Sequence, residues 1–436
     1  MPGFVCAMPA DGHPGAAAAR HCHAGVLWLA MALIVLLQFG PLIGLVGYRL
    51  SENPLWPLSA VLRDVLVAAL VLLALHALCS APVHRRWPAS LRWAALLVVG
   101  VGLASLSSDS GLFTLALNLR RLALVPLLFL AVSLLPWSRQ QLAQLMALLV
   151  ASSVLVALLG LVDRLGGDGL WTEWLRIEAF TAANGLDRYG KIPFDQNGRY
   201  HSWDLEPVLG GPVRRALSSY LEPTTLAAGM AAALALLLAR QARGHRQPWA
   251  LALVLACGLL TVSKGFVLYL LLLLAWRVLG VPAPQHVLQL SLGAVLVALA
   301  VVARGLSEGA FSHLGGVATA LAHLADGHWL GEGVGEVGNY ANNTEEVGAE
   351  SGLGNAIAQI GVVAFLPLLW LHALARQTLD QARRSGDAGG PWLASWALFW
   401  TASYVFSASS QGVGGNALGF LALALYLHPA ASAERP

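Results

Sequence analysis

The chain has 436 residues, of which 57% are hydrophobic and 11% are charged, and its formal net charge is +3. Soluble globular proteins carry about one-quarter charged residues, so this composition excludes an ordinary soluble domain. The net charge decides little, because the placement of Lys and Arg matters more than their sum in a membrane protein. Apolar runs of about twenty residues, each able to cross a hydrocarbon core of about 30 Å, recur along the chain. They predict an all-α, polytopic membrane protein.

The chain begins with a lead, residues 1–24, which is rich in Ala, Gly and Pro and which we expect to be disordered and cytoplasmic. The apolar run after it is longer than a signal-peptide core and predicts a retained first helix. A single transmembrane domain then covers residues 25–428, followed by a cytoplasmic tail, residues 429–436. About twelve spans are predicted, at 25–46, 58–79, 91–108, 112–136, 142–164, 222–240, 248–262, 265–281, 286–304, 352–374, 391–408 and 413–428.

Lys and Arg mark one set of connections between the predicted spans, and the positive-inside rule assigns this set to the cytoplasm. The short connections of the other set carry only Arg49. Both termini are therefore expected in the cytoplasm, and two long loops, about 165–221 and 305–351, are expected outside. Loops of this length are uncommon unless they have a function. The basic residues of the inner connections are Arg85, Arg86, Arg92, Arg139, Arg240, Arg243, Arg246, Arg277, Arg376, Arg383 and Arg384.

The first outer loop ends in the segment GPVRRALSSYLEPTTLA, in which Arg214 and Arg215 precede a predicted helix. Two adjacent guanidinium groups near the membrane plane suit a phosphate or diphosphate, which arginine binds through two parallel hydrogen bonds. Alternatively, they contact lipid headgroups or pair with Glu206 and Glu222. Glu222 is also a candidate for the wall of a cavity at this site.

A second cationic position lies in TVSKGF, where a tight turn joins two apolar runs and Lys264 is the one charged residue. On the cytoplasmic side Lys264 would be an ordinary anchor under the positive-inside rule. The order of the predicted helices places it outside, where that explanation fails. A ligand-binding role for Lys264 is then the better interpretation.

The third site is GAESGLGNAIAQIG, residues 348–361. Glu350 is expected near a helix N-terminus, where the dipole stabilises a carboxylate, so one interpretation is a helix cap. Ser351, Asn355 and Gln359 follow at i, i+4 and i+8 on one helical face. Lipid cannot satisfy such a polar stripe, which must face other helices or a water-filled cavity. In the second case Glu350 would lie at the rim of an active cavity.

Further charges fall within predicted spans, where they are costly. Arg63 and Asp64 are adjacent and can partly neutralise each other. Arg120 and Arg121 lie about a dozen Å from the outer end of their helix, at 1.5 Å per residue. They must meet an acid, a cavity or a phosphate, and Arg121 is a possible lining residue of the same cavity.

In their order and spacing these segments resemble the O-antigen ligase/Wzy polymerase superfamily of bacterial envelope glycosyltransferases. In that family an outer arginine precedes a helix that starts like R…f…P…lA. The matching positions here are Arg215, Leu221, Pro223, Leu226 and Ala227.

Three later segments extend the resemblance, which covers about residues 200–375 in motif and the whole chain in topology. TVSKG at 261–265 is similar to a hairpin that reads tfSRg, with Lys264 in place of arginine. HWLGEGVGEVG at 328–338 resembles a plGvGxG-like passage. Ligases then have His-Asn, nine residues and Gly-x-x-Gly; here Glu350 replaces the histidine and Ala364 the last glycine.

The resemblance implies a bacterial inner-membrane enzyme with two periplasmic loops and an undecaprenyl-diphosphate-linked glycan as donor. Because Glu350 replaces the ligase-type histidine, we favour a polymerase of exopolysaccharide or O-antigen repeat units over a ligase that transfers glycan to lipid A-core. Arg215 and Lys264, with Arg214, would stabilise the leaving diphosphate, and Glu350 would accept the proton of the attacking hydroxyl. The residues expected to line the cavity are Ser351, Asn355, Gln359, Glu222 and Arg121.

We expect no metal or other cofactor, because the outer histidines lack a compact ligand spacing; these are His201, His313, His323 and His328. A flippase and a chain-length co-polymerase of the same pathway are possible partners, and no nucleic acid is expected. Aromatic residues of the outer loops could stack on sugars or belong to an interfacial belt; they are Trp171, Trp174, Tyr200, Trp203 and Trp329.

The competing class is a secondary transporter, for which about twelve helices is a familiar number. A transporter predicts coupling charges near the midplane and alternating access between similar halves. Here the suggestive groups gather on one predicted side, which favours chemistry on a lipid-borne substrate. A non-catalytic assembly partner of a polysaccharide machine is a third interpretation.

Overall fold

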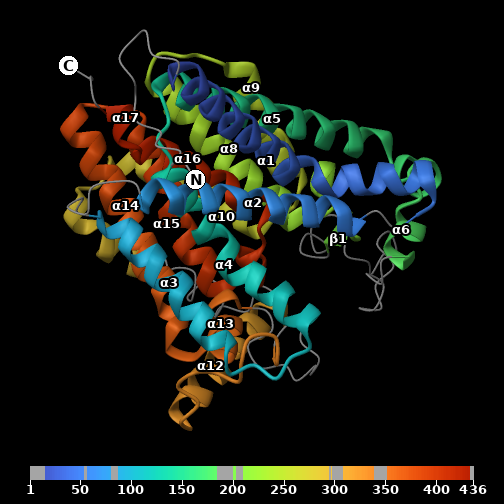
Figure 1. Ribbon diagram of the computed structural model, residues 1–436. Coiled ribbons are helices and arrows are strands. Elements are labelled where there is room, and N and C mark those ends of the chain that lie inside the picture. The colour runs from blue at the N-terminus through green and yellow to red at the C-terminus, as the bar shows by residue number, and fades with distance from the viewer. Residues whose placement is uncertain are drawn as a thin grey trace.

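A computed structural model describes residues 15–53, 56–79, 87–183, 200–202, 210–293, 296, 308–337 and 351–432. Nearly all of these residues are helical (Figure 1). Among them, the one strand pair is a short antiparallel ladder, in which β1 (His201–Ser202) pairs with β2 (Val213–Arg214). The predicted all-α class is therefore confirmed.

Six segments of the described residues are long and apolar enough to cross a membrane by length and composition: Ala24–Ser51, Leu58–Cys79, Leu112–Leu134, Arg139–Gly166, Pro223–Ala242 and Gly352–Ser385. Four shorter apolar helices accompany them: Ala89–Ser105, Pro248–Leu260, Gly315–Ala325 and Gly414–Leu427. The chain is a helical membrane protein, and the number of about twelve spans stays a prediction.

The α-helices are α1 (Gly15–Ser51), α2 (Trp56–Cys79), α3 (Ala89–Ser105), α4 (Leu112–Leu134), α5 (Arg139–Gly166), α6 (Ile177–Ala183), α8 (Pro223–Ala242), α9 (Pro248–Leu260), α10 (Lys264–Leu279), α12 (Glu308–Ala325), α13 (Gly352–Ile360), α14 (Leu366–Ser385), α15 (Gly390–Phe406), α16 (Gly414–Leu427) and α17 (Pro429–Ser432). Short 3-10 turns are η3 (Ser218–Tyr220), η4 (Pro284–His286), η5 (Gly361–Phe365) and η6 (Ala408–Gln411), and η1 (Leu170–Trp174) is a π turn.

The first and the fifth helix begin at least three residues earlier than predicted. The first starts at Gly15, within the expected lead, because the AAAA run that follows Gly15 is made of the strongest helix former. The remainder of the predicted lead lies outside the described residues. The fifth helix starts at Arg139 because Ser138 and Gln141 form a capping box, in which each side chain accepts from the other's backbone N–H.

The predicted span 352–374 is broken into α13, η5 and α14. Gly361 lies at the break with a φ of 56°, and a Cβ at this position would overlap the carbonyl oxygen of Trp329. After the break α14 continues to Ser385, well beyond the predicted end. Most of the predicted span 286–304 lies outside the described residues.

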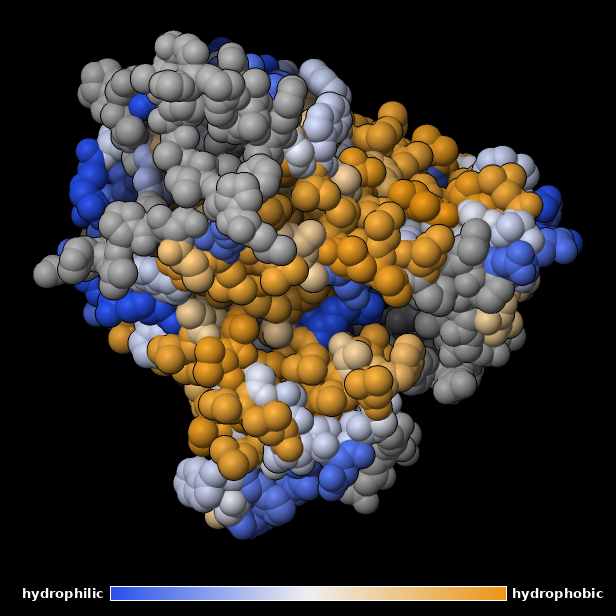
Figure 2. Space-filling model, viewed as in Figure 1, coloured by the Kyte–Doolittle hydropathy of each residue, from blue (hydrophilic) through white to orange (hydrophobic). Residues whose placement is uncertain are grey.

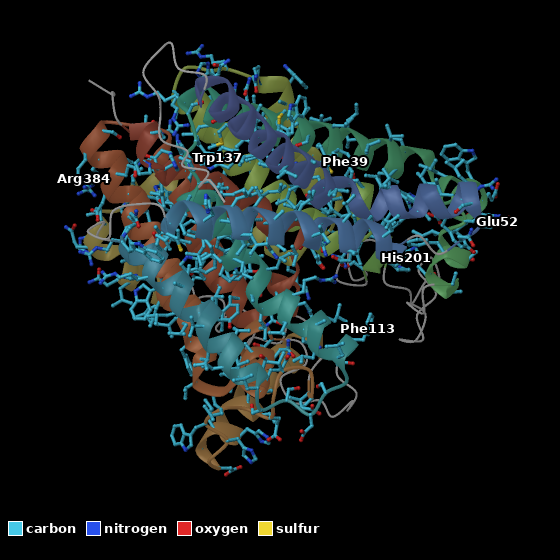
Figure 3. The ribbon with its side chains drawn as sticks, viewed as in Figure 1. Phe39, Glu52, Phe113, Trp137, His201 and Arg384 are labelled. Carbon is cyan, nitrogen blue, oxygen red and sulfur yellow. The ribbon has the colours of Figure 1, made fainter. Side chains whose placement is uncertain are left out.

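The centre of the bundle is formed by α8 and α16, which are buried along most of their length. Small residues allow the two helices to approach closely, because a Cβ on Gly415 would overlap the carbonyl oxygen of Thr225. This centre is packed on by α4, α5, α9, α10 and α15, together with α1 and α14, while α2 and α3 pack against α1, α4 and α14. Figure 3 shows Glu52 and Arg384 at opposite ends of the molecule.

The first outer loop is folded onto the end of α1. A second, smaller hydrophobic core joins Leu45 of α1 to the loop residues Trp171, Leu175, Ile177, Phe180, Tyr200, Leu217 and Leu221. This core holds the segment before α8, which carries Arg214 and Arg215, against the bundle. The described part of this loop is therefore a structured element that positions the segment with Arg214 and Arg215.

Candidate functional site

Arg215 lies against the hairpin between α9 and α10. Its Nε donates to the carbonyl oxygen of Thr261 at 2.8 Å, and the backbone N–H of Ala216 donates to Leu260 at 2.9 Å. Lys264, three residues beyond Thr261, is the first residue of α10 and is exposed. The structure thus brings two of the three predicted site segments together. We call Arg215, Thr261 and Lys264 the hairpin site.

The hairpin is compact because α9 and α10 approach closely. A Cβ on Gly258 would overlap the ring of Phe266, so a larger residue cannot occupy this crossing. The turn itself includes Val262 at a φ of 48°, a left-handed conformation that a β-branched residue rarely adopts. The turn is thereby held in one shape, with Lys264 presented at its end.

Arg214 is bound in a buried ion-pair cluster. Its guanidinium contacts Asp163 at 2.7 Å and also pairs with Asp168, and its side chain is 9% exposed. The sequence analysis offered ion pairs with Glu206 and Glu222 as an alternative for this arginine. Arg214 does pair with acids, but these acids are Asp163 and Asp168. Glu206 lies outside the described residues. Arg214 is therefore excluded from the diphosphate clamp, in which the sequence analysis had included it.

Asp163 organises the segment that contains Arg215. Its side chain is 1% exposed, accepts from Trp171 Nε1 at 2.5 Å and accepts from the backbone N–H of Leu217 at 2.6 Å. Sequence reasoning did not single out this residue. The available signal was an acid in the last turn of an apolar helix, a position that is costly without a partner. Asp163 positions Arg215 through the backbone that it binds.

Glu222 acts as the N-cap of α8. Its carboxylate accepts from the backbone N–H of Thr224 at 3.2 Å and of Thr225 at 2.5 Å, and Pro223 occupies the first helical position. These bonds satisfy donors that an α-helix leaves open at its start. The geometry accounts for Glu222 as a cap and gives no reason to keep it as a cavity-wall residue.

The polar stripe on α13 is buried among helices. Ser351 Oγ donates to the carbonyl oxygen of Val405 at 2.5 Å and caps α13 at Gly354 N. Asn355 Nδ2 donates to Gln411 Oε1 at 2.6 Å, and Gln359 Nε2 donates to Asn355 Oδ1 at 3.2 Å. The stripe therefore connects α13 to the α15–α16 region. Glu350, the proposed base, lies outside the described residues.

The glycine-rich passage at 328–337 docks on the end of α13. Glu332 N donates to Ala358 O at 2.8 Å, and Gly335 N donates to Gln359 Oε1 at 3.1 Å. Gly335 has a φ of 88°, and its would-be Cβ lies 2.9 Å from Ser110 Oγ. Two segments that carry the family resemblance thus form one structural unit.

The hairpin site and the start of α13 are both anchored on α15. A Cβ built on Gly265 would lie 3.9 Å from Phe399 Cζ, while Ser351 binds Val405 six residues later. The helices α10 and α13 thus pack against the same neighbour, α15.

A cavity inside the bundle is lined by Arg121 of α4. Trp400 and Tyr404 of α15 and Ser410 and Gln411 of η6 form part of its wall, together with apolar residues of α3, α4 and α14. Gln411 also accepts the hydrogen bond from Asn355. The polar stripe therefore contacts the wall of this cavity through Gln411. Arg121 lines the same cavity, and a cavity was one of the three surroundings expected for a charge at this depth in α4.

A charged cluster lies between α2 and α4. Asp64 pairs with Arg63 at 2.9 Å and with Arg120 at 3.6 Å, so Arg120 meets an acid. Figure 2 shows a hydrophilic spot within a hollow of this largely apolar face, in the region where α2 and α4 run side by side in Figure 1. With Arg121, the cluster carries more positive than negative charge.

The aromatic residues of the outer loops divide into two groups. Trp171 and Tyr200 are buried in the small core, where they cannot stack on a sugar, which corrects the expectation for these two. Trp174 and Trp329 are exposed and keep an accessible face. Trp203 lies outside the described residues.

Two histidines of the second outer loop lie together, contrary to the expectation that they lack a compact arrangement. His323 Nε2 is 2.6 Å from Glu332 Oε1, and His328 Nδ1 is 2.8 Å from the same oxygen. The imidazole rings stack with centroids 4.2 Å apart. Sequence reasoning missed the cluster because only the turn after α12 brings position 323 beside position 328.

No model of a known protein family matches the chain, and a search of curated proteins also finds no match.

Proposed function

We propose that the protein is a glycosyltransferase that polymerises lipid-linked oligosaccharide repeat units on the outer face of a bacterial inner membrane. The donor is a glycan on a polyprenyl diphosphate, with undecaprenyl diphosphate as the expected carrier. The observation that supports this proposal most strongly is the contact of Arg215 with the hairpin that presents Lys264. Two cations from separate chain segments thereby share one site.

The hairpin site has the charge that this reaction needs. When the acceptor hydroxyl attacks the anomeric carbon, the bond from that carbon to the phosphate oxygen breaks and the diphosphate leaves with additional negative charge. Arg215 and Lys264 stabilise this charge as fixed cations. Arg215 is half-buried and oriented by Thr261, whereas Lys264 is exposed and can reach a substrate.

The acceptor supplies a proton that must leave as the new glycosidic bond forms. We keep Glu350 as the proposed base, because its neighbour Ser351 caps α13, which packs on the same helix, α15, as the hairpin helix α10. The cluster of Arg63, Asp64 and Arg120 between α2 and α4 offers a second group of cations. It could hold the carrier while the glycan reacts.

The direct test is polymerisation by purified full-length protein supplied with lipid-linked repeat units. Removal of one preorganised electrostatic donor costs about 10²–10³-fold in rate, so we expect losses of this size for Lys264→Ala and Arg215→Ala. Lys264→Arg keeps the charge and should retain most of the activity. Arg277→Ala, at the opposite end of α10, is the matched control and should react as the wild type does.

The outcomes separate this proposal from its alternatives. Transfer of preformed polymer to lipid A-core, without polymerisation of repeat units, would identify the ligase activity. Full polymerisation by Lys264→Ala and Arg215→Ala would contradict the proposed clamp. For the base, Glu350→Gln should lose activity while Glu345→Gln, in the same acidic loop, should keep it.

A further inference from the structure

We propose that His323, His328 and Glu332 form a binding site for a divalent transition-metal ion, with Zn²⁺ as the representative ion. The three ligand atoms, His323 Nε2, His328 Nδ1 and one Glu332 carboxylate oxygen, lie within 4.8 Å of one another. Two imidazoles and one carboxylate are a donor set that suits Zn²⁺, Co²⁺ and Ni²⁺. This inference is independent of the proposed function.

The backbone holds all three ligands in place. His323 is in the last turn of α12, and its carbonyl oxygen accepts from His328 N at 3.2 Å. Glu332 is fixed through its own N–H to Ala358 O at 2.8 Å. The site is therefore built on the junction between α12 and α13, and ligand placement does not depend on a free loop.

The surroundings favour a cation. Between positions 305 and 351 the sequence holds seven acidic residues and no Lys or Arg. Asp326 is within the same turn as the cluster, and Glu336 follows in the glycine-rich passage. A segment with this charge concentrates cations near its surface, and no basic side chain of the segment competes for Glu332.

The side chains have room to adopt metal geometry. An ion binds imidazole nitrogen at about 2.0–2.1 Å, so the two stacked rings must turn apart to direct both lone pairs at one ion. The side chains of His323 and His328 are 29% and 46% exposed, which leaves space for this rotation. Three protein ligands leave a coordination position for water, which is the arrangement of an open site.

Binding would join α12 to the passage that docks on α13. His323 Nε2 hydrogen-bonds to Glu332 Oε1, His328 Nδ1 lies 2.8 Å from the same oxygen, and a bound ion would replace any proton that these nitrogens direct at the carboxylate. Because binding displaces protons, the affinity is expected to fall at acidic pH. An ordinary hydrogen-bonded cluster with no metal affinity is the alternative that an experiment must exclude.

The test uses the full chain purified without a polyhistidine tag, stripped with a chelator and titrated in detergent with Co²⁺, followed by competition with Zn²⁺. We expect one equivalent of Co²⁺ to bind with visible absorption bands and to be displaced by Zn²⁺. Even outer-shell changes weaken metal sites by roughly 10–100-fold, so His328→Ala and Glu332→Gln should each lose at least that much affinity.

Two control variants distinguish the cluster from other ligands. His286→Ala removes an exposed histidine elsewhere and should bind as the wild type does; Asp326→Asn removes a nearby negative charge that is no ligand and should weaken binding less than either ligand substitution. Size-exclusion profiles check that each variant is folded. The proposal is overturned if the wild type takes up no Co²⁺, if His328→Ala and Glu332→Gln bind it unchanged, or if Ca²⁺ displaces it as well as Zn²⁺ does.

Discussion

Asp163 is the residue on which the shape of the first outer loop most depends. One buried carboxylate binds the guanidinium of Arg214, the indole N–H of Trp171 and the backbone N–H of Leu217. These bonds offset the cost of burying the charges, which is otherwise several kcal/mol per ion. An acid that is itself almost completely buried therefore helps to hold the backbone that carries Arg215.

Replacing this acid tests its positioning role. Asp163→Asn leaves Arg214 buried and takes away its buried acidic partner, while the half-exposed Asp168 remains. Breaking a buried pair in this way costs about 3–5 kcal/mol, so the apparent melting temperature in detergent should fall clearly. Glu173→Gln, an exposed acid in the same loop, is the control and should melt as the wild type does. Equal melting of Asp163→Asn and wild type would contradict the role.

At the scale of elements, the junction of α12, the glycine-rich passage and α13 is the most constrained part of the second outer loop. Gly361 ends α13 in a left-handed conformation, directly against the carbonyl oxygen of Trp329, and Val362 N donates to that oxygen at 2.9 Å. The break between α13 and α14 is thus the docking point of the passage. No pattern in the hydrophobic run 352–374 indicates this break.

A pair of glycine substitutions tests the docking. Gly361→Ala adds a Cβ where backbone already lies, and a left-handed alanine costs about 1–2 kcal/mol even without that contact. We expect a lower melting temperature and faster proteolysis of the passage. Gly315→Ala, in α12, places its Cβ in open space and should be neutral or stabilising by about 0.5–1 kcal/mol. Equal behaviour of the two variants would show that the passage is not docked at Gly361.

Local sequence signals predicted the features that depend on nearby residues. Pro223 indicated the start of α8, the TVSKG turn indicated the hairpin, and the spacing of Ser351, Asn355 and Gln359 indicated a face that avoids lipid. Contacts between distant segments left no such signal. The partner of Arg214 is 51 positions away at Asp163, and the partner of Asn355 is Gln411. Which polar residues meet depends on the packing of whole helices.

At the scale of the molecule, the cationic residues lie toward different ends of the helical bundle. Arg384 lies at the end opposite Glu52 (Figure 3), and the loop that carries Arg215 folds onto the end of α1 near Glu52. Within α10, Lys264 and Arg277 occupy opposite ends. In the predicted topology Arg277 is a cytoplasmic anchor under the positive-inside rule, whereas Lys264 requires another explanation.

The accessibility of position 264 in intact cells tests the account most directly. A cysteine is introduced by Lys264→Cys in a chain whose four native cysteines are replaced, and a membrane-impermeant maleimide is added from outside to cells with a permeabilised outer membrane. We predict labelling of the Lys264→Cys variant, while Arg277→Cys is labelled only after the inner membrane is opened. Labelling of position 264 only from the cytosol would contradict an outward-facing hairpin site and, with it, the proposed chemistry on a lipid diphosphate.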